Sequence, residues 1–207
     1  AYEIMMNKKT LLIFFLIVIV GKFAYSQDDF VGAGRALRFD GVDDYVDLGD
    51  IYDDIALPIT ISVWIYVDPT NDAFSLPIID SQENSLEYNG FTFLASTVPH
   101  VAITYGDGEG GNHPAYRRTK SAYFDSFAAR WLNITAIMRG ASDMDIYLNG
   151  TNIGGVYDGT SKFPLNSDSP SEVAKIGHHF SNGIHHRFKV MMADLRIWNR
   201  SFSQDLV

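Results

Sequence analysis

The sequence predicts an all-β protein of the sandwich or barrel type. Short runs rich in Val, Ile, Thr, Tyr and Phe recur along the chain, and Gly, Asn, Asp or Pro separate them about every eight to fifteen residues. No convincing amphipathic helix interrupts these runs after residue 26. Asn149-Gly150 directly follows the apolar residues 146–148 and is a strong two-residue hairpin signal, because both positions tolerate positive φ. Together these features are typical of packed antiparallel sheets.

The first 26 residues have the pattern of a secretory signal. Lys8 and Lys9 precede ten apolar residues over 11–20, and the small residues Ala24 and Ser26 follow. A membrane-spanning helix needs about 20 apolar residues, so an uncleaved anchor is the less favoured alternative. We therefore expect a leader over 1–5, a signal peptide over 6–26 that is cleaved after Ser26, and no membrane association after cleavage.

The charge of the remaining chain limits its partners. Three of the 16 basic and one of the 25 acidic residues lie in the first 26 positions, which leaves 13 basic and 24 acidic side chains and a net charge of −11. Such a surface repels nucleic acid and anionic lipid, and it suits divalent cations, neutral glycans or basic protein patches. The chain contains no cysteine, so neither disulfides nor a thiol-linked lipid anchor contribute to it.

The predicted strands follow one another over residues 27–207, which we expect to form a single domain that is truncated at its C-terminus. The clearest strand covers residues 59–67, where Ile or Val fills every odd position and the polar or aromatic residues fill the even ones, so that one face is buried. The other predicted strands cover residues 36–39, 45–48, 77–80, 90–95, 100–105, 116–124, 131–138, 143–148, 173–177 and 190–198. The polar loops at 106–114 and 161–171 lie within this series and mark no domain boundary.

Four blocks of sequence resemble the laminin-G-like and pentraxin-like domains of secreted bacterial proteins. These are ALRFDGVDDYVDLG from Ala36, the strand over 59–66, WLNIT from Trp131 with the hairpin at 146–150, and ADLRIWNR from Ala193. They occur in the order found in that family, whereas residues 86–127 match no block of it. The resemblance implies a concanavalin A-like, two-sheet antiparallel jelly-roll sandwich that is secreted or held at the bacterial cell surface. It also implies that the first and last strands are neighbours, with Phe39 close to Ile197.

A calcium site is the first candidate for bound chemistry. Asp40, Asp43, Asp44 and Asp47 crowd the turn after the first strand, and Asp194 lies at the start of the last one. Asp40, Asp43 and Asp194 are the candidate ligands. If the first and last strands lie side by side, these carboxylates and nearby carbonyl groups supply the oxygens that Ca²⁺ prefers. The alternative is that they only stabilise turns.

A histidine cluster is the second candidate. His178, His179, His185 and His186 flank Asn182-Gly183, and a hairpin there would bring the two pairs together across the strands. Such a cluster predicts a zinc or copper site, or histidines that are merely solvated and gain charge at mildly acid pH.

Glycan binding is the third candidate, and we expect it near the Gly-rich loop. The candidate residues there are Tyr105, Asp107, Asn112, Tyr116 and Tyr123. Exposed aromatic rings beside amides and carboxylates stack on sugars and form hydrogen bonds with them. The alternative is that the tyrosines only fill the outer face of a sheet.

No catalytic motif supports an enzyme. The chain has no paired carboxylates in a glycosidase pattern, no serine elbow, no phosphate-binding loop and no His-Glu-x-x-His motif. We therefore predict a non-catalytic extracellular recognition domain that binds carbohydrate, with Ca²⁺ as the one candidate cofactor. A protein-adhesion module of a larger surface protein and a glycoside hydrolase are the alternatives, and the partner is accordingly a polysaccharide or a cell-surface protein.

Overall fold

The computed structural model describes residues 35–52, 55–71, 75–81, 89–96, 100–108, 117–127, 129–160, 173–181 and 184–207. The predicted leader and signal peptide lie outside these residues and stay predictions. No helix in the described ranges is both long and apolar enough to span a bilayer.

Strands make up almost all the regular structure of the described residues. They are β1 (Leu37–Asp40), β2 (Val46–Gly49), β3 (Ile59–Val67), β4 (Ser75–Asp80), β5 (Phe91–Ser96), β6 (His100–Gly106), β7 (Arg117–Tyr123), β8 (Trp131–Gly140), β9 (Asp143–Leu148), β10 (Thr151–Asn152), β11 (Val156–Gly159), β12 (Ala174–Ile176), β13 (His179–Ser181), β14 (Ile184–His186) and β15 (Lys189–Trp198). One short 3₁₀ helix, η1 (Gln204–Leu206), follows the last strand. The all-β prediction is confirmed.

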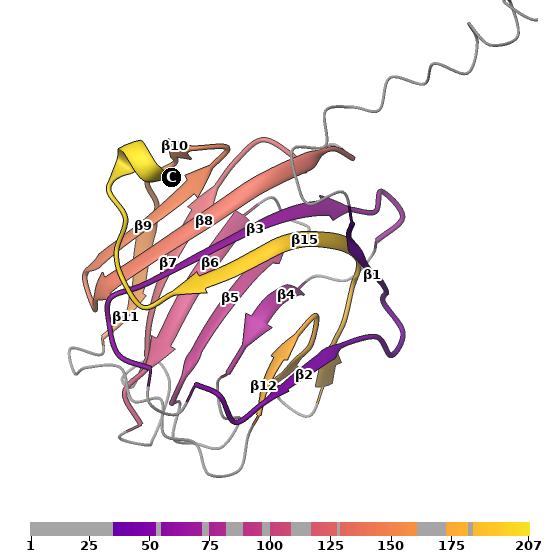
Figure 1. Ribbon diagram of the computed structural model, residues 1–207, viewed down its shortest axis with the longest axis horizontal. Coiled ribbons are helices and arrows are strands. Elements are labelled where there is room, and N and C mark those ends of the chain that lie inside the picture. The colour runs from indigo at the N-terminus through magenta and orange to yellow at the C-terminus, as the bar shows by residue number, and fades with distance from the viewer. Residues whose placement is uncertain are drawn as a thin grey trace, which may run out of the picture. The chain divides into compact units, whose positions relative to one another are not determined.

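Two antiparallel sheets form the sandwich (Figure 1). The six-stranded sheet has the order β1-β15-β3-β8-β9-β10, and the seven-stranded sheet has the order β11-β7-β6-β5-β4-β12-β2. A separate hairpin pairs β13 with β14. This arrangement of two antiparallel layers confirms the jelly-roll sandwich that the sequence predicted.

The alternation in β3 determines which of its faces is buried. Its odd-numbered residues, from Ile59 to Val67, are at most 7% exposed and belong to the core. They meet aromatic residues of the opposite sheet such as Phe91, Phe93 and Tyr105, which are fully buried. Because neighbouring side chains on a strand point to opposite faces, Ser62, Trp64 and Tyr66 lie on the outer face of the six-stranded sheet.

The first and last strands are neighbours, as expected, but their register differs from the expected one. β1 pairs with the N-terminal half of β15, so Phe39 lies opposite Val190 rather than beside Ile197. Ile197 instead pairs with Ile61 of β3. The four-residue β1 is too short to reach the far end of the ten-residue β15.

Lys120 on β7 ties the two sheets together at one edge. Its ammonium group donates a hydrogen bond to the carbonyl of Met144 on β9 and lies 3.9 Å from Asp145 Oδ1. Lys120 is 7% exposed, so its charge is held by these partners and by the ring of Tyr157, whose centroid is 5.3 Å from Nζ. A buried cation without such partners would strongly destabilise the fold.

Gly177, which directly follows β12, lies so close to Phe39 of β1 that only glycine fits there. Its φ is +78°, and a Cβ atom built on it would lie 2.5 Å from Phe39 Cε1. Gly49 has a similar φ of +67°, but a Cβ atom there would meet nothing within 4 Å. A comparison of alanine substitutions at the two glycines therefore distinguishes the free-energy cost of the positive φ from that of the contact with Phe39.

We predict that Gly177→Ala lowers the free energy of unfolding by about 3 kcal/mol and that Gly49→Ala lowers it by about 1 kcal/mol, because only the first substitution displaces a core aromatic ring. Chemical denaturation of both variants measures the difference. Equal losses in the two variants would contradict the close contact between Gly177 and Phe39.

Candidate functional site

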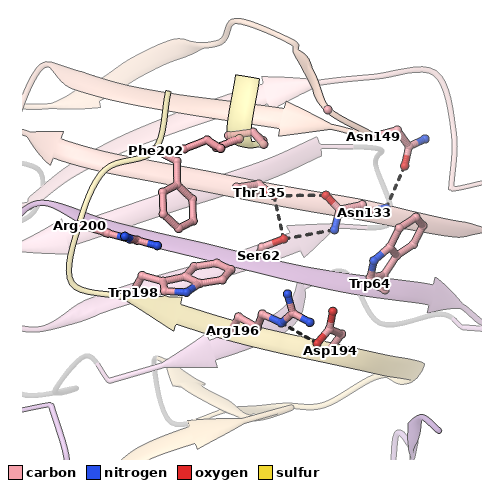
Figure 2. Close-up of a pocket in the computed structure, with 13 residues that line it drawn as sticks. Ser62, Trp64, Asn133, Thr135, Asn149, Asp194, Arg196, Trp198, Arg200 and Phe202 are labelled. Atoms are coloured by element: carbon pink, nitrogen blue, oxygen red, sulfur yellow. Dashed lines mark hydrogen bonds and ion pairs between the residues drawn. The ribbon is translucent and has the colours of Figure 1, made fainter. Parts of the chain in front are cut away.

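A hollow of the described surface lies on the outer face of the six-stranded sheet. Its volume is about 610 Å³, and β3, β8, β15 and the segment that follows β15 supply its lining (Figure 2). The lining residues that dominate it are Trp64, Asn133, Asp194, Arg196, Trp198 and Phe202. We call this hollow the main hollow.

Hydrogen bonds organise the floor of the main hollow. The Thr135 hydroxyl donates to Ser62 Oγ at 2.9 Å, and Asn133 Nδ2 donates to the same oxygen at 3.2 Å. The backbone N–H of Asn133 donates to Asn149 Oδ1 at 2.9 Å. These bonds join β3, β8 and the hairpin at Asn149, and they leave a fixed set of hydroxyl and amide groups at the surface of the hollow.

Aromatic rings stand at both ends of this polar floor. Figure 2 shows Trp64 at one end and Trp198 with Phe202 at the other. The rings of Trp198 and Phe202 have centroids 4.8 Å apart in an edge-to-face arrangement, and the Arg200 guanidinium lies 4.6 Å from the Phe202 centroid. These contacts hold the Trp198 end in place, so the spacing of the aromatic groups does not depend on a bound ligand.

A bulge in β15 places the charged pair of the main hollow. The register with β3 shifts between Ala193 and Arg196, and Asp194 has a φ of +53°. Asp194 Oδ1 accepts a hydrogen bond from Arg196 Nε at 2.8 Å. Non-glycine residues rarely adopt a positive φ, and such positions gather at functional sites.

The main hollow offers groups for stacking and groups for hydrogen bonding. Its rings offer apolar faces for stacking, and its hydroxyl, amide and ionic groups offer both donors and acceptors. Asp194 is the one carboxylate side chain among its lining residues. The usual hydrolysis of a glycosidic bond uses a pair of carboxylates. The lining of this hollow contains one carboxylate side chain and therefore no such pair.

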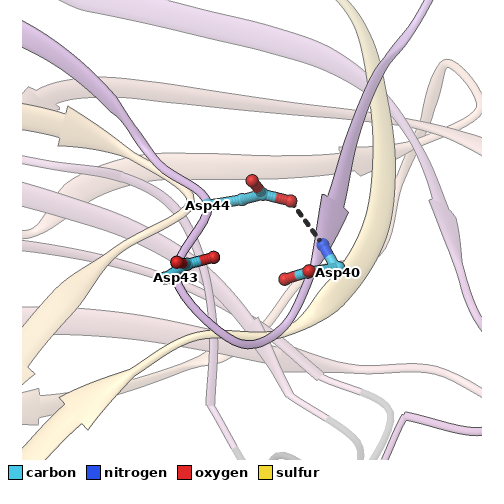
Figure 3. A group of neighbouring side chains, drawn as sticks. All are labelled: Asp40, Asp43 and Asp44. Atoms are coloured by element: carbon cyan, nitrogen blue, oxygen red, sulfur yellow. Dashed lines mark hydrogen bonds between the residues drawn. The ribbon is translucent and has the colours of Figure 1, made fainter.

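The predicted calcium ligands are only partly brought together. Asp40, Asp43 and Asp44 each offer an oxygen within 4.8 Å of the others, and all three are exposed (Figure 3). Asp44 Oδ2 accepts a hydrogen bond from the Asp40 N–H at 2.9 Å, and Asp40 Oδ1 accepts one from the Val42 N–H at 2.8 Å. The carboxylates of Asp40 and Asp44 therefore stabilise the turn through hydrogen bonds to its backbone.

Asp194 lies apart from this group, against the expectation. Asp40 is opposite Lys189 in the sheet, five residues before Asp194 on β15, which corresponds to about 16 Å along a strand. The bulge directs Asp194 into the main hollow with Arg196 instead. A calcium ion at the turn would thus depend on Asp40, Asp43 and Asp44 without Asp194.

The calcium prediction is tested by thermal unfolding. If Ca²⁺ binds at the turn, a concentration of 10 mM raises the melting temperature by about 3–10 °C relative to chelator, because only the folded state holds the ion. Asp43→Asn removes the shift, whereas Asp125→Asn, at an exposed residue elsewhere, retains it. Equal melting temperatures of the wild type in calcium and in chelator would rule out the site.

The four histidines do meet across a hairpin, in two separate pairs. His179 lies opposite His186, with ring centroids 5.6 Å apart, and His178 Nε2 shares a hydrogen bond of 2.8 Å with His185 Nδ1. His179 Nδ1 also lies 2.5 Å from Asp80 Oδ2. Within the described ranges these side chains form no group of three potential metal ligands, so the zinc or copper site stays a prediction without a matching arrangement.

Burial lowers the pKa of His178 to about 4, and the nearby charges of Lys175, His185 and Arg187 act in the same direction. Burial and the charge of His179 also lower the pKa of His186. The folded protein thus keeps His178 neutral under conditions in which the unfolded chain is protonated.

We predict that acid destabilises the protein through His178. Because its folded pKa lies below the unfolded value of about 6.5, its contribution is complete above pH 6.5 and is lost as the pH falls toward 4. The loss is on the order of 2 kcal/mol and is measured by denaturation at pH 7 and at pH 4.5. His178→Gln flattens this dependence, and an unchanged slope in that variant would contradict the assignment.

The glycan site predicted near the Gly-rich loop agrees least with the structure. Tyr105 is fully buried in the core and Asp107 is 4% exposed, so neither offers a surface to a ligand, and the prediction for these two residues is wrong. Tyr105 faces inward because it shares the alternation of β6 with Val101 and Ile103. Tyr123 is 63% exposed and packs against His100 at 5.2 Å, which leaves it available for stacking. Asn112 and Tyr116 lie outside the described residues.

The sequence analysis missed the residues of the main hollow, although the signal for them was present. Trp64 occupies an outward position in the strand with the clearest alternation, and Arg196 and Trp198 belong to the closing block. Only the register of β15 on β3 brings these segments together, since Arg196 pairs with Ser62 and Trp198 with Thr60.

Comparison with known proteins connects this architecture to one sequence family. A profile described as the Concanavalin A-like lectin/glucanases superfamily matches residues 40–207. No curated protein sequence matches the chain significantly.

Solved structures of binding domains share the fold. The binding domain of botulinum neurotoxin serotype D/C is 16% identical with a TM-score of 0.56, over 82% of this chain and 41% of that domain. The serotype C1 binding domain is 15% identical with a TM-score of 0.50, over 75% of this chain and 36% of that domain. This chain thus spans less than half the length of those neurotoxin domains.

A bacterial sialidase module matches over nearly its whole length. The CBM40 module of the Ruminococcus gnavus IT-sialidase, solved with α2,3-sialyllactose bound, is 11% identical with a TM-score of 0.56, over 82% of this chain and 95% of the module. At such identities the likeness concerns the fold.

Proposed function

The chain belongs to the concanavalin A-like lectin/glucanase superfamily, and on this basis we propose that it is a non-catalytic domain that binds carbohydrate. The binding site of the proposal is the main hollow. The observation that carries it is the pairing of two tryptophans, Trp64 and Trp198, across a floor of hydrogen-bonding side chains.

Carbohydrate recognition needs both kinds of group that meet in this hollow. The C–H faces of a sugar ring pack on indole rings, while its hydroxyls require donors and acceptors at fixed positions. Ser62, Asn133 and Thr135 are held to one another by hydrogen bonds, so they are positioned before a ligand arrives. Such preorganisation reduces the entropy lost on binding.

Fold relatives support this choice of ligand. The sialidase module was solved with a sugar bound, and it shares the fold over 95% of its length. Export through a signal peptide and stabilisation by Ca²⁺ at the Asp40 turn complete the proposal, and both rest on the sequence. A protein ligand at the same surface is an outcome that the binding experiment distinguishes.

We predict that Trp64→Ala and Trp198→Ala each weaken binding to a polysaccharide by about tenfold or more, since truncation of a central aromatic anchor costs more than 1 kcal/mol. Trp64→Phe retains part of the affinity because it keeps a ring at this position. Affinity electrophoresis against a panel of soluble polysaccharides, followed by calorimetry on those that retard the protein, measures the loss.

Tyr123→Ala is the comparison variant. It removes an exposed ring on β7 of the other sheet, so it leaves affinity unchanged if the main hollow is the site. A loss in Tyr123→Ala with none in Trp64→Ala would transfer the site to the other sheet. Failure of every polysaccharide to bind, together with capture of a surface protein, would replace carbohydrate binding by adhesion.

A further inference from the structure

A second hollow lies on the same face of the six-stranded sheet as the main hollow. Its volume is about 410 Å³, and its lining includes Arg38, Tyr66, Asp68, Thr70, Lys189 and Met191. Arg38 and Tyr66 both pair with Met191 across β15, which places these three side chains in one row on the outer face. We call it the second hollow.

The two hollows follow one another along β3. Ser62 and Trp64 line the main hollow, and Tyr66 and Asp68 line the second, at successive outward positions. The distance from Ser62 to Asp68 is about 20 Å along a strand. The hollows are therefore consecutive parts of one track along the sheet.

Aromatic rings lie between the two hollows along β3. Trp64 borders the main hollow and Tyr66 borders the second, and the ring of Trp131 lies 5.8 Å from that of Tyr66. Rings at successive outward positions of a strand present a run of apolar surface between two polar hollows. A chain of sugar rings that crosses from one hollow to the other would pass over this surface.

The charges in the second hollow balance one another. Hydrogen bonds from the Thr70 hydroxyl and backbone N–H, at 2.7 and 2.8 Å, lower the pKa of Asp68, and the charges of Lys189 and Arg38 lower it further. Asp68 is therefore ionised and faces two cations.

The balance extends over both hollows. Four cationic side chains, Arg38, Lys189, Arg196 and Arg200, are accompanied there by three carboxylates, Asp40, Asp68 and Asp194, so the side chains sum to +1. In a chain whose net charge after residue 26 is −11, this face is close to neutral. It suits an uncharged ligand rich in hydroxyl groups, which gains hydrogen bonds from ionic partners without the need to neutralise them.

We propose that the two hollows are subsites of one groove, which takes an internal stretch of a linear, uncharged polysaccharide rather than a single terminal sugar. The proposal rests on the proposed function and adds to it the class of ligand. A terminal sugar would need only the main hollow, whereas the second hollow continues the same face with its own aromatic and hydrogen-bonding groups.

The test measures how affinity depends on the length of the ligand. Calorimetry is performed with β-1,3-glucan, β-1,4-glucan, β-mannan and xylan fragments, from disaccharide to octasaccharide. In at least one series we expect the association constant to rise by about tenfold or more between disaccharide and hexasaccharide, because the second subsite adds contacts to a ligand that is already bound. We expect the increase to stop once the fragment fills both hollows.

Variants assign the increase to the second hollow. Tyr66→Ala lowers the affinity for the hexasaccharide by about tenfold and leaves the affinity for the disaccharide within about twofold. Arg38→Gln, at an exposed side chain, gives the same selective loss if Tyr66→Ala does not fold. Val156→Ala, at a residue that is 66% exposed on β11 of the other sheet, is the control and leaves both affinities unchanged.

Each outcome decides one of the two proposals. A disaccharide that binds as tightly as the hexasaccharide, with a loss in Trp64→Ala and none in Tyr66→Ala, overturns the groove and leaves the main hollow as a carbohydrate site. An increase with length that neither Tyr66→Ala nor Arg38→Gln reduces also overturns the groove. Absence of binding in all four series overturns the groove, and the polysaccharide panel then decides whether the main hollow is a carbohydrate site.

Discussion

The antiparallel pairing of β15 with β3 is the interaction on which the rest of the sandwich depends. It joins the end of the described chain to a strand more than a hundred residues earlier, and it provides β1 with its neighbour in the sheet. The bulge at Asp194 changes the register so that Arg196 lies opposite Ser62 and Trp198 opposite Thr60. The Thr60 hydroxyl then donates to the carbonyl of Arg200 at 2.6 Å, which fixes the start of the C-terminal segment on the same face. The fold and the proposed site thus have one cause.

The six-stranded sheet carries the core on one face and the proposed binding site on the other. Its inner face consists of aliphatic residues that are excluded from water, and a strand of this kind tolerates little change there. Its outer face carries all three tryptophans of the chain, Trp64, Trp131 and Trp198, together with the charged side chains that line the two hollows. Large rings at outward positions do little for the core, so their concentration on one face is more typical of a binding surface.

How far the sequence predicted this structure depended on whether the signal was local. The alternation in residues 59–67 sufficed to assign the buried face of β3, and the Asn149-Gly150 turn occurs as expected, with Asn149 at a φ of +49°. The site required the register between distant strands, which no local pattern contains. Phe39 was expected beside Ile197 and lies opposite Val190 instead. The same uncertainty in register hid the fact that Ser62, Trp64 and Trp198 line one hollow. Tyr105 was assigned to a site because the Gly-rich loop follows it, although its own strand alternation places it in the core.

The central claim, that carbohydrate lies on the outer face of the six-stranded sheet, is tested most directly by intrinsic tryptophan fluorescence. All three indole rings of the chain belong to this face, so a sugar that displaces water from them changes their emission. We expect titration with a polysaccharide that retards the protein in affinity electrophoresis to shift the emission maximum to shorter wavelength, in a saturable manner and with the affinity that calorimetry gives. A polysaccharide that binds measurably in calorimetry and leaves the emission of all three tryptophans unchanged would contradict the account.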